Sequence, residues 1–352
     1  YGDNQNCRVI LNTVDNSFIY QDYVRPNNVI MTPYQLHPAG DEEYFISVEQ
    51  EYRSPNTYRK VGIIKVDNTG TELWRIFVGS DSTSNYNARI FDAPGGNYFV
   101  VWSDPYIPGL NEQINSLRTI RMAKLLDHGD WAELIDEKDL RPELGYFHRG
   151  PFVIQDHYQD SNGDIYLLLQ TWGGYQSALV KIHANGVGAW MRIFRVYPEN
   201  TADLTQTMLY GFSRTHDGGF MLTGEYRSAP GTMFPSGIQK ALVIKTDSCG
   251  CLYEEGCNPN CADSYVNQFI YMQQAEIYPN PANEIIHIKL PEQTSQVNTY
   301  SVKIYSQLGS LVKEQKLNSV SQGINISELK SGLYTMHISG GGKYYIGGFV
   351  RE

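Results

Sequence analysis

The chain has 352 residues, of which 41% are hydrophobic and only 19% charged, with a formal net charge of -10. The abundance of Tyr, Gly and Pro favours short strands and tight turns, which excludes helical bundles and coiled coils. No run of Lys and Arg could neutralise a phosphate backbone, so nucleic acid is not an expected partner. No apolar run approaches the roughly 18 residues of a membrane helix, so no membrane-spanning segment is predicted.

The N-terminal end and the cysteines predict export. The sequence starts at Tyr1 rather than Met, which suggests that a secretory signal peptide has been removed. Disulfide bonds in an oxidising compartment are favoured over a zinc site, because the spacing of the clustered Cys does not give two Cys-x2-Cys hooks. We expect the first Cys to pair with one of the four late ones. The candidates are Cys7, Cys249, Cys251, Cys257 and Cys261.

Two sequence patterns repeat along most of the chain. A Gly-containing turn followed by an apolar strand occurs near residues 40, 95, 162 and 217, and a later strand carries a Lys before a second Gly turn. These are Lys65, Lys124, Lys181 and Lys245, at intervals of 59, 57 and 64 residues. Each unit is predicted to hold four strands, and such sheets bury both faces by stacking around an axis. We therefore predict an all-β chain with a β-propeller of four or five blades.

The N-terminal segment also reads as a hairpin, with strands at residues 8–13 and 18–23 around a turn at 15–17. This hairpin could complete the last blade or form part of a fifth blade. The blade number is left at four or five.

A tetrapeptide, Glu-Tyr-Arg-Ser, occurs at residues 51–54 and again at 225–228, about three repeats apart. Equivalent loops of a propeller gather on one face, and flat aromatic rings suit sugar stacking or a protein partner. Packing of these side chains between blades is an equal alternative. The predicted ligand or partner face contains Tyr52, Arg53, Trp102, Tyr106, Trp172, Tyr175, Tyr226 and Arg227.

Catalytic motifs are not evident, and an enzyme is the less favoured interpretation. Asp92 and Asp156 near the ends of inner strands are the candidate acid pair of a polysaccharide hydrolase, whose carboxylate separation would decide the matter. Residues 160–164 are interpreted as a hairpin turn rather than a calcium loop, because Thr171 stands where a bidentate acid is expected. His148 and His157 are interpreted as structural. No cofactor and no metal are predicted.

The pattern changes near Gln274 to short strands with alternating apolar positions. We predict two domains, the propeller at residues 1–273 and a small immunoglobulin-like β-sandwich at 274–352.

Three ordered segments distinguish this second domain: residues 278–282, with Tyr-Pro-Asn-Pro-Ala, residues 302–312 and residues 326–334. Together they resemble the type A C-terminal sorting domain of cargo proteins of the Bacteroidota type IX secretion system. The family often carries Lys on both sides of a Phe-Val pair, whereas here only Arg351 keeps the positive charge. The residues of the resemblance are Tyr278, Pro279, Asn280, Pro281, Gly309, Gly332, Tyr334, Phe349 and Arg351.

The resemblance implies export through the periplasm of a Gram-negative bacterium and passage across the outer membrane by a translocon that engages the C-terminal domain. In many members a surface peptidase then removes that domain. The repeated region also resembles propellers found beside such sorting domains. We therefore predict a secreted or outer-membrane-surface cargo whose propeller binds a glycan or a surface protein, with a secreted polysaccharide hydrolase as the alternative.

Overall fold

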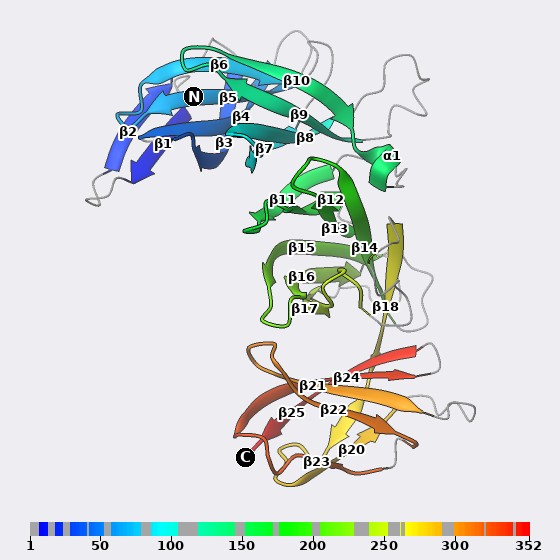
Figure 1. Ribbon diagram of the computed structural model, residues 1–352. Coiled ribbons are helices and arrows are strands. Elements are labelled where there is room, and N and C mark those ends of the chain that lie inside the picture. The colour runs from blue at the N-terminus through cyan, green and yellow to red at the C-terminus, as the bar shows by residue number, and fades with distance from the viewer. Residues whose placement is uncertain are drawn as a thin grey trace. The chain divides into compact units, whose positions relative to one another are not determined.

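The computed structural model in Figure 1 is almost entirely β. It describes residues 7–12, 18–23, 29–40, 42–52, 58–78, 86–104, 119–144, 152–171, 176–198, 205–228, 239–252, 261, 265–290, 299–319, 322–340 and 343–352. Within these ranges the helix is α1 (Arg141–Leu144), and no helix has the length and apolar character needed to cross a membrane.

The chain divides into two compact units. Unit 1 is Tyr1–Gly173, Ala178–Arg192 and Cys261–Val266, and unit 2 is Gly174–Ser177, Ile193–Asn260 and Asn267–Glu352. This division differs from the predicted boundary at residues 273/274, which stays a prediction.

Unit 1 begins with an antiparallel hairpin and two four-stranded antiparallel sheets. The hairpin strands pair with each other. In each larger sheet the strands follow one another in chain order, the topology of a propeller blade. The strands are β1 (Cys7–Asn12) and β2 (Phe18–Tyr23), then β3 (Val29–Pro38), β4 (Glu43–Tyr52), β5 (Tyr58–Asp67) and β6 (Glu72–Val78), then β7 (Tyr86–Ala93), β8 (Asn97–Asp104), β9 (Thr119–Asp127) and β10 (Ala132–Asp139).

Two further blades have the same sequential strand order. The third is β11 (Phe152–Gln159), β12 (Ile165–Thr171), β13 (Ser177–Ile182) and β14 (Gly188–Pro198), and the boundary between the units passes through β13 and β14. The fourth, in unit 2, is β15 (Thr205–Arg214), β16 (Phe220–Ser228) and β17 (Gln239–Thr246). The predicted all-β fold, with repeated propeller-type blades before a C-terminal sandwich, is confirmed.

Side-chain acceptors shape the turns that make the repeat visible in the sequence. Asp67 Oδ1 accepts hydrogen bonds from the backbone N–H groups of Thr69 and Thr71 at 2.9 and 2.8 Å. Gly70, in the same turn, has a φ of 81°, a left-handed conformation that a residue without Cβ adopts at little cost. Asp247 and Gly250 repeat this arrangement in the fourth blade, where Asp247 Oδ1 accepts from Cys251 N at 2.7 Å. The turns thus depend on one carboxylate and one glycine each.

In three blades the repeated Lys forms an ion pair with an acid at or just before the start of the second strand. Lys65 Nζ lies 2.7 Å from Glu43 Oε2, and the corresponding distances are 2.7 Å for Lys181–Asp164 and 2.8 Å for Lys245–Asp217. The second blade differs, because Asn97 stands at the position of Glu43. Lys65 Nζ also lies 2.8 Å from Asp127 Oδ2 of the second blade, so the first of these Lys residues joins two blades. The Lys motif therefore marks ion pairs that stabilise the sheets rather than a ligand site.

Glutamine side chains join the first strands of neighbouring blades in unit 1. Gln35 on β3 donates from Nε2 to Ile90 O at 2.9 Å, and its Oε1 accepts from Ile90 N at 2.7 Å. Gln159 on β11 bonds the backbone of Asp92 in the same way, at 2.8 and 3.0 Å. Strand β7 is thus held on both sides through its main chain.

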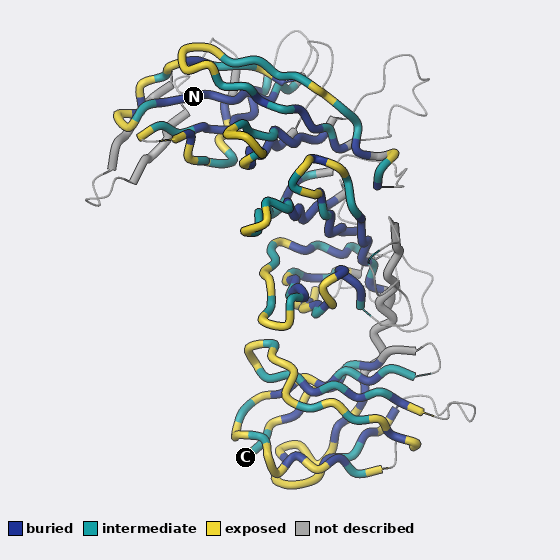
Figure 2. Tube along the Cα trace, viewed as in Figure 1, coloured by how far each residue is buried: buried dark blue, intermediate teal, exposed yellow. Residues whose placement is uncertain are grey.

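The hydrophobic core of the first two sheets combines aliphatic and aromatic side chains, with Phe45, Ile63, Ile90, Val100 and Trp102 all 0% exposed. Figure 2 shows these buried strands in dark blue between exposed turns. Phe45 packs edge-on against Tyr98, with ring centroids 4.7 Å apart. Fully burying a large apolar side chain contributes roughly 1.5–3 kcal/mol, so this cluster is a main source of stability for unit 1.

The C-terminal part of unit 2 is a two-sheet sandwich, as predicted. One sheet contains β19 (Glu276–Tyr278), β20 (Ile285–Lys289) and β23 (Ile324–Asn325). The other contains, in order, β25 (Lys343–Arg351), β24 (Gly332–Gly340), β21 (Tyr300–Ser306) and β22 (Leu311–Leu317), and β18 (Tyr265–Gln274) pairs in parallel with β25. The core lies between the sheets and includes Ile286, Ile304, Met336, Ile338 and Phe349, each at most 1% exposed.

Candidate functional site

The predicted ligand face is only partly within the described residues. Arg53, Tyr106, Trp172 and Tyr175 lie outside them, and Tyr52 is described only as the last residue of β4. Trp102 is 0% exposed and belongs to the core, so it does not contribute to an exposed face. Tyr226 is half-buried and Arg227 is exposed.

The two tetrapeptides do not occupy equivalent positions, which corrects the sequence-based alignment. Tyr44 and Phe220 are equivalent, because each is the first residue of its second strand to pair with the first strand, and its partner lies six positions earlier. Counted from them, Glu225 corresponds to Glu49, and Arg227 corresponds to Glu51. The offset is two residues, so the side chains still alternate to the same faces.

A β-bulge recurs at the same point of the first strand in all four blades, and in the second blade the shift lies between Tyr86 and Arg89. The other three blades share one pattern. The register shifts between Pro33 and Gln35, between Ile154 and Asp156, and between Leu209 and Gly211. The extra residue at each shift is Tyr34, Gln155 or Tyr210. Bulges re-aim a side chain and are frequent next to active sites.

Each extra residue donates a hydrogen bond to the same position of the second strand. Tyr34 OH donates to Glu49 at 3.2 Å, and Tyr210 OH donates to Glu225 at 2.7 Å. Gln155 Nε2 donates to Gln170 at 2.6 Å. In the second blade this position is Ser103, whose buried Oγ has no hydrogen-bond partner among the described residues. The bulge therefore builds a polar pair into three of the blades.

The pair in the first blade is closed to solvent. Glu49 is 5% exposed, and Arg59 bridges it to Glu51 with contacts of 3.1 and 3.0 Å. Burial raises the pKa of Glu49 against the opposing effect of Arg59. Burial, with the neighbouring Glu49 carboxylate, also raises the pKa of Tyr34 to about 12. This arrangement is structural, because its polar atoms are occupied by one another.

The pair in the fourth blade is open, and we call Tyr210, Glu225, Arg227 and Gln239 the Tyr210 cluster. Tyr210 is 47% exposed, and the Arg227 side chain is 45% exposed. Arg227 Nε donates to Glu225 Oε1 at 2.7 Å, and Gln239 Nε2 donates to Oε2. The hydrogen bond from Tyr210, followed by those from Gln239 and Arg227, lowers the pKa of Glu225. An ionised carboxylate thus holds an exposed phenol and guanidinium in place.

The candidate acid pair lies on two neighbouring first strands. The Asp92 side chain is 73% exposed, with Oδ1 3.1 Å from His37 Nε2. Asp156 is half-buried, and its Oδ1 accepts from the backbone of His157 at 2.8 Å. The glutamine bonds place Asp92 beside Gln159 rather than beside Asp156. The two acids therefore lie at different levels along β7 and β11.

One buried cationic side chain and one half-buried imidazole lie among these first strands. Arg89 is 5% exposed, donates to Ile154 O at 3.2 Å and lies 5.3 Å over the Tyr34 ring. Burial lowers the pKa of Arg89 to about 10. Burial, with the charge of Arg89, lowers the pKa of His157 to about 4, and this ring packs edge-on against Phe91. His157 is neutral at physiological pH, in line with a structural role, and His148 lies outside the described residues.

The structure also distinguishes between a disulfide and a zinc site at the cysteine cluster. Cys249, Cys251 and Cys261 are disulfide-bonded, so disulfides rather than zinc occupy this cluster. Cys257 and the Cys7 side chain lie outside the described residues, so the Cys7 pairing stays a prediction.

The loop at residues 160–164 is a hairpin turn rather than a calcium loop. Asp160 Oδ1 accepts hydrogen bonds from Asn162 N and Asp164 N, which closes the turn. The described part of the chain contains no group of three His, Cys, Asp or Glu placed to hold a metal ion.

Most of the predicted sorting residues converge although they are distant in sequence, whereas Gly309 lies in the β21–β22 turn. Asn280 Oδ1 accepts from Val350 N at 2.9 Å, and its Nδ2 donates to Gly348 O at 3.2 Å. Tyr334 stacks on Phe349 with ring centroids 5.4 Å apart and donates to Lys330 O at 2.6 Å. Gly332 pairs with Arg351 at the end of the β24–β25 ladder. Tyr278 stacks on His287, and the adjoining Pro279 and Pro281 follow cis peptide bonds. The segment at 278–282 is therefore fastened to the last strand.

Comparisons with known proteins agree with this arrangement. Residues 276–350 match the family described as "Secretion system C-terminal sorting domain". No curated protein matches the chain. An alpha-L-arabinanase of Penicillium chrysogenum complexed with arabinobiose aligns with 98% of this chain and 97% of its own, at 12% identity and a TM-score of 0.41. The GH93 alpha-L-arabinofuranosidase of Fusarium graminearum with arabinobiose covers 92% of both chains, at 12% identity and a TM-score of 0.39. Both scores are below 0.5, so these similarities assign no activity and no ligand to this chain.

The fold and the sorting domain define an exported protein in which β-sheet blades precede a C-terminal export module. The chain is a cargo protein of the type IX secretion system, and its sorting domain implies interaction with that system and a secreted or cell-surface location.

Proposed function

We propose that the blades, at residues 1–273, form a binding module that acts outside the cell after the domain at 274–352 has directed export. The observation that carries the proposal is the Tyr210 cluster, where a partly exposed ring and guanidinium are held by one carboxylate. Glu225 and Arg227 lie near the end of β16 and Gln239 begins β17, next to Tyr226 of the predicted ligand face.

A glycan is the ligand class that this cluster fits best. A sugar presents hydroxyl groups that accept from a guanidinium and donate to a carboxylate, and its apolar face stacks on an aromatic ring. The exposed Tyr210 ring and Arg227 supply the stacking surface and the donor, and the buried Glu225 carboxylate holds both in place within one blade. Surface adhesion through such a glycan at the outer membrane is part of the same proposal.

The binding test compares single substitutions in the full-length protein on a glycan array. We expect Arg227→Ala to weaken binding about tenfold, because a charge-assisted hydrogen bond contributes roughly 1.5–3 kcal/mol. Lys240→Ala is the matched control, since Lys240 pairs with Tyr226 and lies on the opposite face of the same blade. Unchanged binding by the Arg227 variant would place the ligand elsewhere, and binding only to a surface protein would replace the glycan.

A polysaccharide hydrolase is the second candidate, supported by the position of Asp92 and Asp156 on adjacent first strands. If it is correct, the purified protein releases reducing ends from a polysaccharide, and Asp156→Asn lowers the rate by at least a hundredfold. Glycan binding without product release would favour the binding module.

A further inference from the structure

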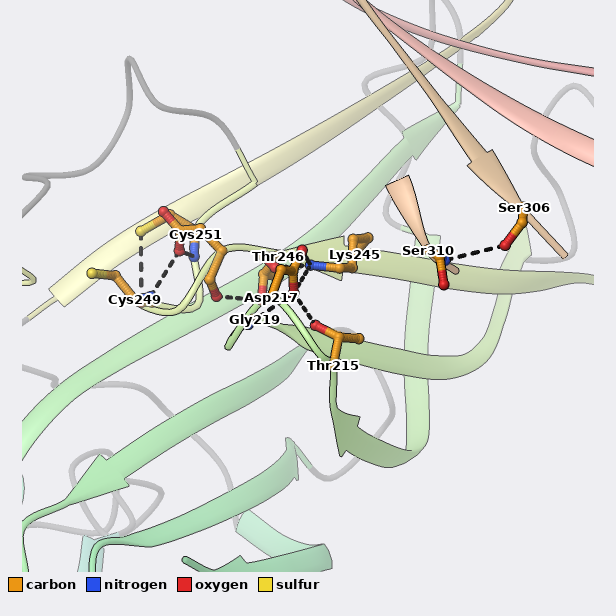
Figure 3. Close-up of polar contacts among 10 residues, drawn as sticks. Thr215, Asp217, Gly219, Lys245, Thr246, Cys249, Cys251, Ser306 and Ser310 are labelled. Carbon is orange, nitrogen blue, oxygen red and sulfur yellow. Dashed lines mark hydrogen bonds and ion pairs between the residues drawn. The ribbon is translucent and has the colours of Figure 1, made fainter. Parts of the chain in front are cut away.

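A turn of the sorting domain is shaped around a side chain of the fourth blade. The turn joins β21 to β22, and Gly309 N donates to Ser306 O at 2.8 Å while Ser310 N donates to Ser306 Oγ at 3.3 Å. A Cβ atom on Gly309 would lie 1.7 Å from Met221 Cε and 3.3 Å from its Sδ. The Met221 methyl group therefore occupies the space that any other residue would need, and Figure 3 shows the turn beside the end of this blade.

Two side chains on the outer face of the same sheet are covered as well. Ile304 and Met336 point into the sandwich core, so their neighbours Tyr305 and His337 project from the opposite face. Both are nevertheless half-buried, with ring centroids 4.7 Å apart. Neighbouring groups therefore cover part of this outer face.

The charges that act on these side chains come partly from the fourth blade. Burial raises the pKa of Tyr305 to about 12, and the charges of Asp217 and Glu314 add to this. Burial lowers the pKa of His337 to about 4, and Lys303 and Lys245 add to this. Asp217 and Lys245 are the ion pair of the fourth blade, with Lys245 Nζ 2.8 Å from Asp217 Oδ2 (Figure 3).

We propose that the sorting domain docks on the last blade through the Met221–Gly309 contact and the outer face of β21 and β24, so that this face is covered within the folded cargo. Gly309 then has two roles, since its φ of 77° shapes the turn and its missing side chain admits Met221. Leu308, the neighbouring tip residue, is 88% exposed and takes no part in the contact.

The experiment separates the two roles of Gly309 in the full-length protein. Asn tolerates the left-handed conformation but carries a Cβ, so Gly309→Asn keeps the turn and displaces Met221. The readout is the titration of His337 by NMR, with its pKa expected to rise by at least one unit from about 4 in this variant. Leu308→Ala is the control and leaves the titration unchanged.

A double substitution identifies the contact. Met221→Ala removes the atoms that the new Cβ would meet, so Gly309→Asn in that background is expected to shift the His337 pKa by less than half as much. Met221→Glu leaves the turn intact and is expected to raise the pKa as Gly309→Asn does, which serves if the Gly309 variant does not fold. Docking is refuted if His337 of the unmodified protein titrates near its ordinary pKa. It is also refuted if His337 has the same pKa in the Met221→Glu variant and in a folded Gly309→Asn variant as in the unmodified protein.

Discussion

Asp217 shows how one carboxylate serves a turn and a strand together. Its Oδ1 accepts from Gly219 N at 3.1 Å, and its Oδ2 lies 2.8 Å from Lys245 Nζ. Burial opposes ionisation of Asp217, but the hydrogen bonds from Lys245, Thr215 and Gly219 outweigh it and lower its pKa to about 2. The carboxylate is therefore ionised at any pH that a secreted protein meets.

This ion pair predicts a defined acid dependence. Because the folded pKa lies below the ordinary value of 3.8, its stabilisation is complete above about pH 4 and is lost as the pH falls towards 2. Asp217→Asn should cost about 1 kcal/mol at pH 7, after the discount for a carboxylate that is half exposed. Amide exchange of β16 and β17 measures the effect, and a difference between the two proteins that persists undiminished at pH 2 would contradict this origin.

At the level of the strand, the bulge in β15 leaves no room opposite it. A Cβ on Gly224 would lie 2.0 Å from Met208 O and 2.7 Å from Leu209 Cα, which are backbone atoms that cannot rotate away. Gly224→Ala is therefore expected to destabilise the fourth blade by about 3 kcal/mol, the upper end of the usual cost of overpacking. Thermal unfolding measures this. Gly218→Ala is the comparison, because a Cβ on Gly218 would have room but its φ is 81°. A larger loss of stability in the Gly218 variant than in the Gly224 variant would point to backbone strain rather than overpacking.

The repeat could be predicted because its turns need particular residues. Gly at left-handed positions such as Gly70, and Lys at the ion pairs, recur at nearly fixed spacing. The bulges have no comparable signature, since an extra residue can be of any type, here Tyr or Gln. Tyr44 and Phe220 define the equivalent positions of the two strands and show that the tetrapeptides are offset by two residues. Aligning the tetrapeptides by their identical residues hides this offset.

Trp102 shows a second limit of sequence reading. Val100, Val101 and Trp102 are all 0% exposed, so β8 is buried on both faces. Alternation of apolar and polar residues cannot reveal which aromatic faces solvent in such a strand. The open Tyr210 cluster was missed for a related reason, because the bulge that turns Tyr210 towards Glu225 is visible only in the strand register.

At the scale of the whole molecule, export depends on a domain whose motif residues meet through the fold. Deletion of residues 274–352 is expected to leave the blades in the periplasm of a type IX-competent host, whereas the full-length protein reaches the cell surface or medium. Cell fractionation and protease accessibility measure this. Full-length protein with Lys240→Ala, a substitution outside this domain, controls for handling. A truncated protein found outside the cell in normal amount would refute the export role of this domain.

The glutamines that hold β7 have a consequence for how such a chain can evolve. Gln35 and Gln159 bind only the main chain of Ile90 and Asp92, so these four hydrogen bonds do not depend on the side chains at those two positions. A duplicated or recombined module that keeps a glutamine at this point can form the same bonds with any neighbouring strand. Substitution of Ile90 or Asp92 therefore leaves this part of each seam intact.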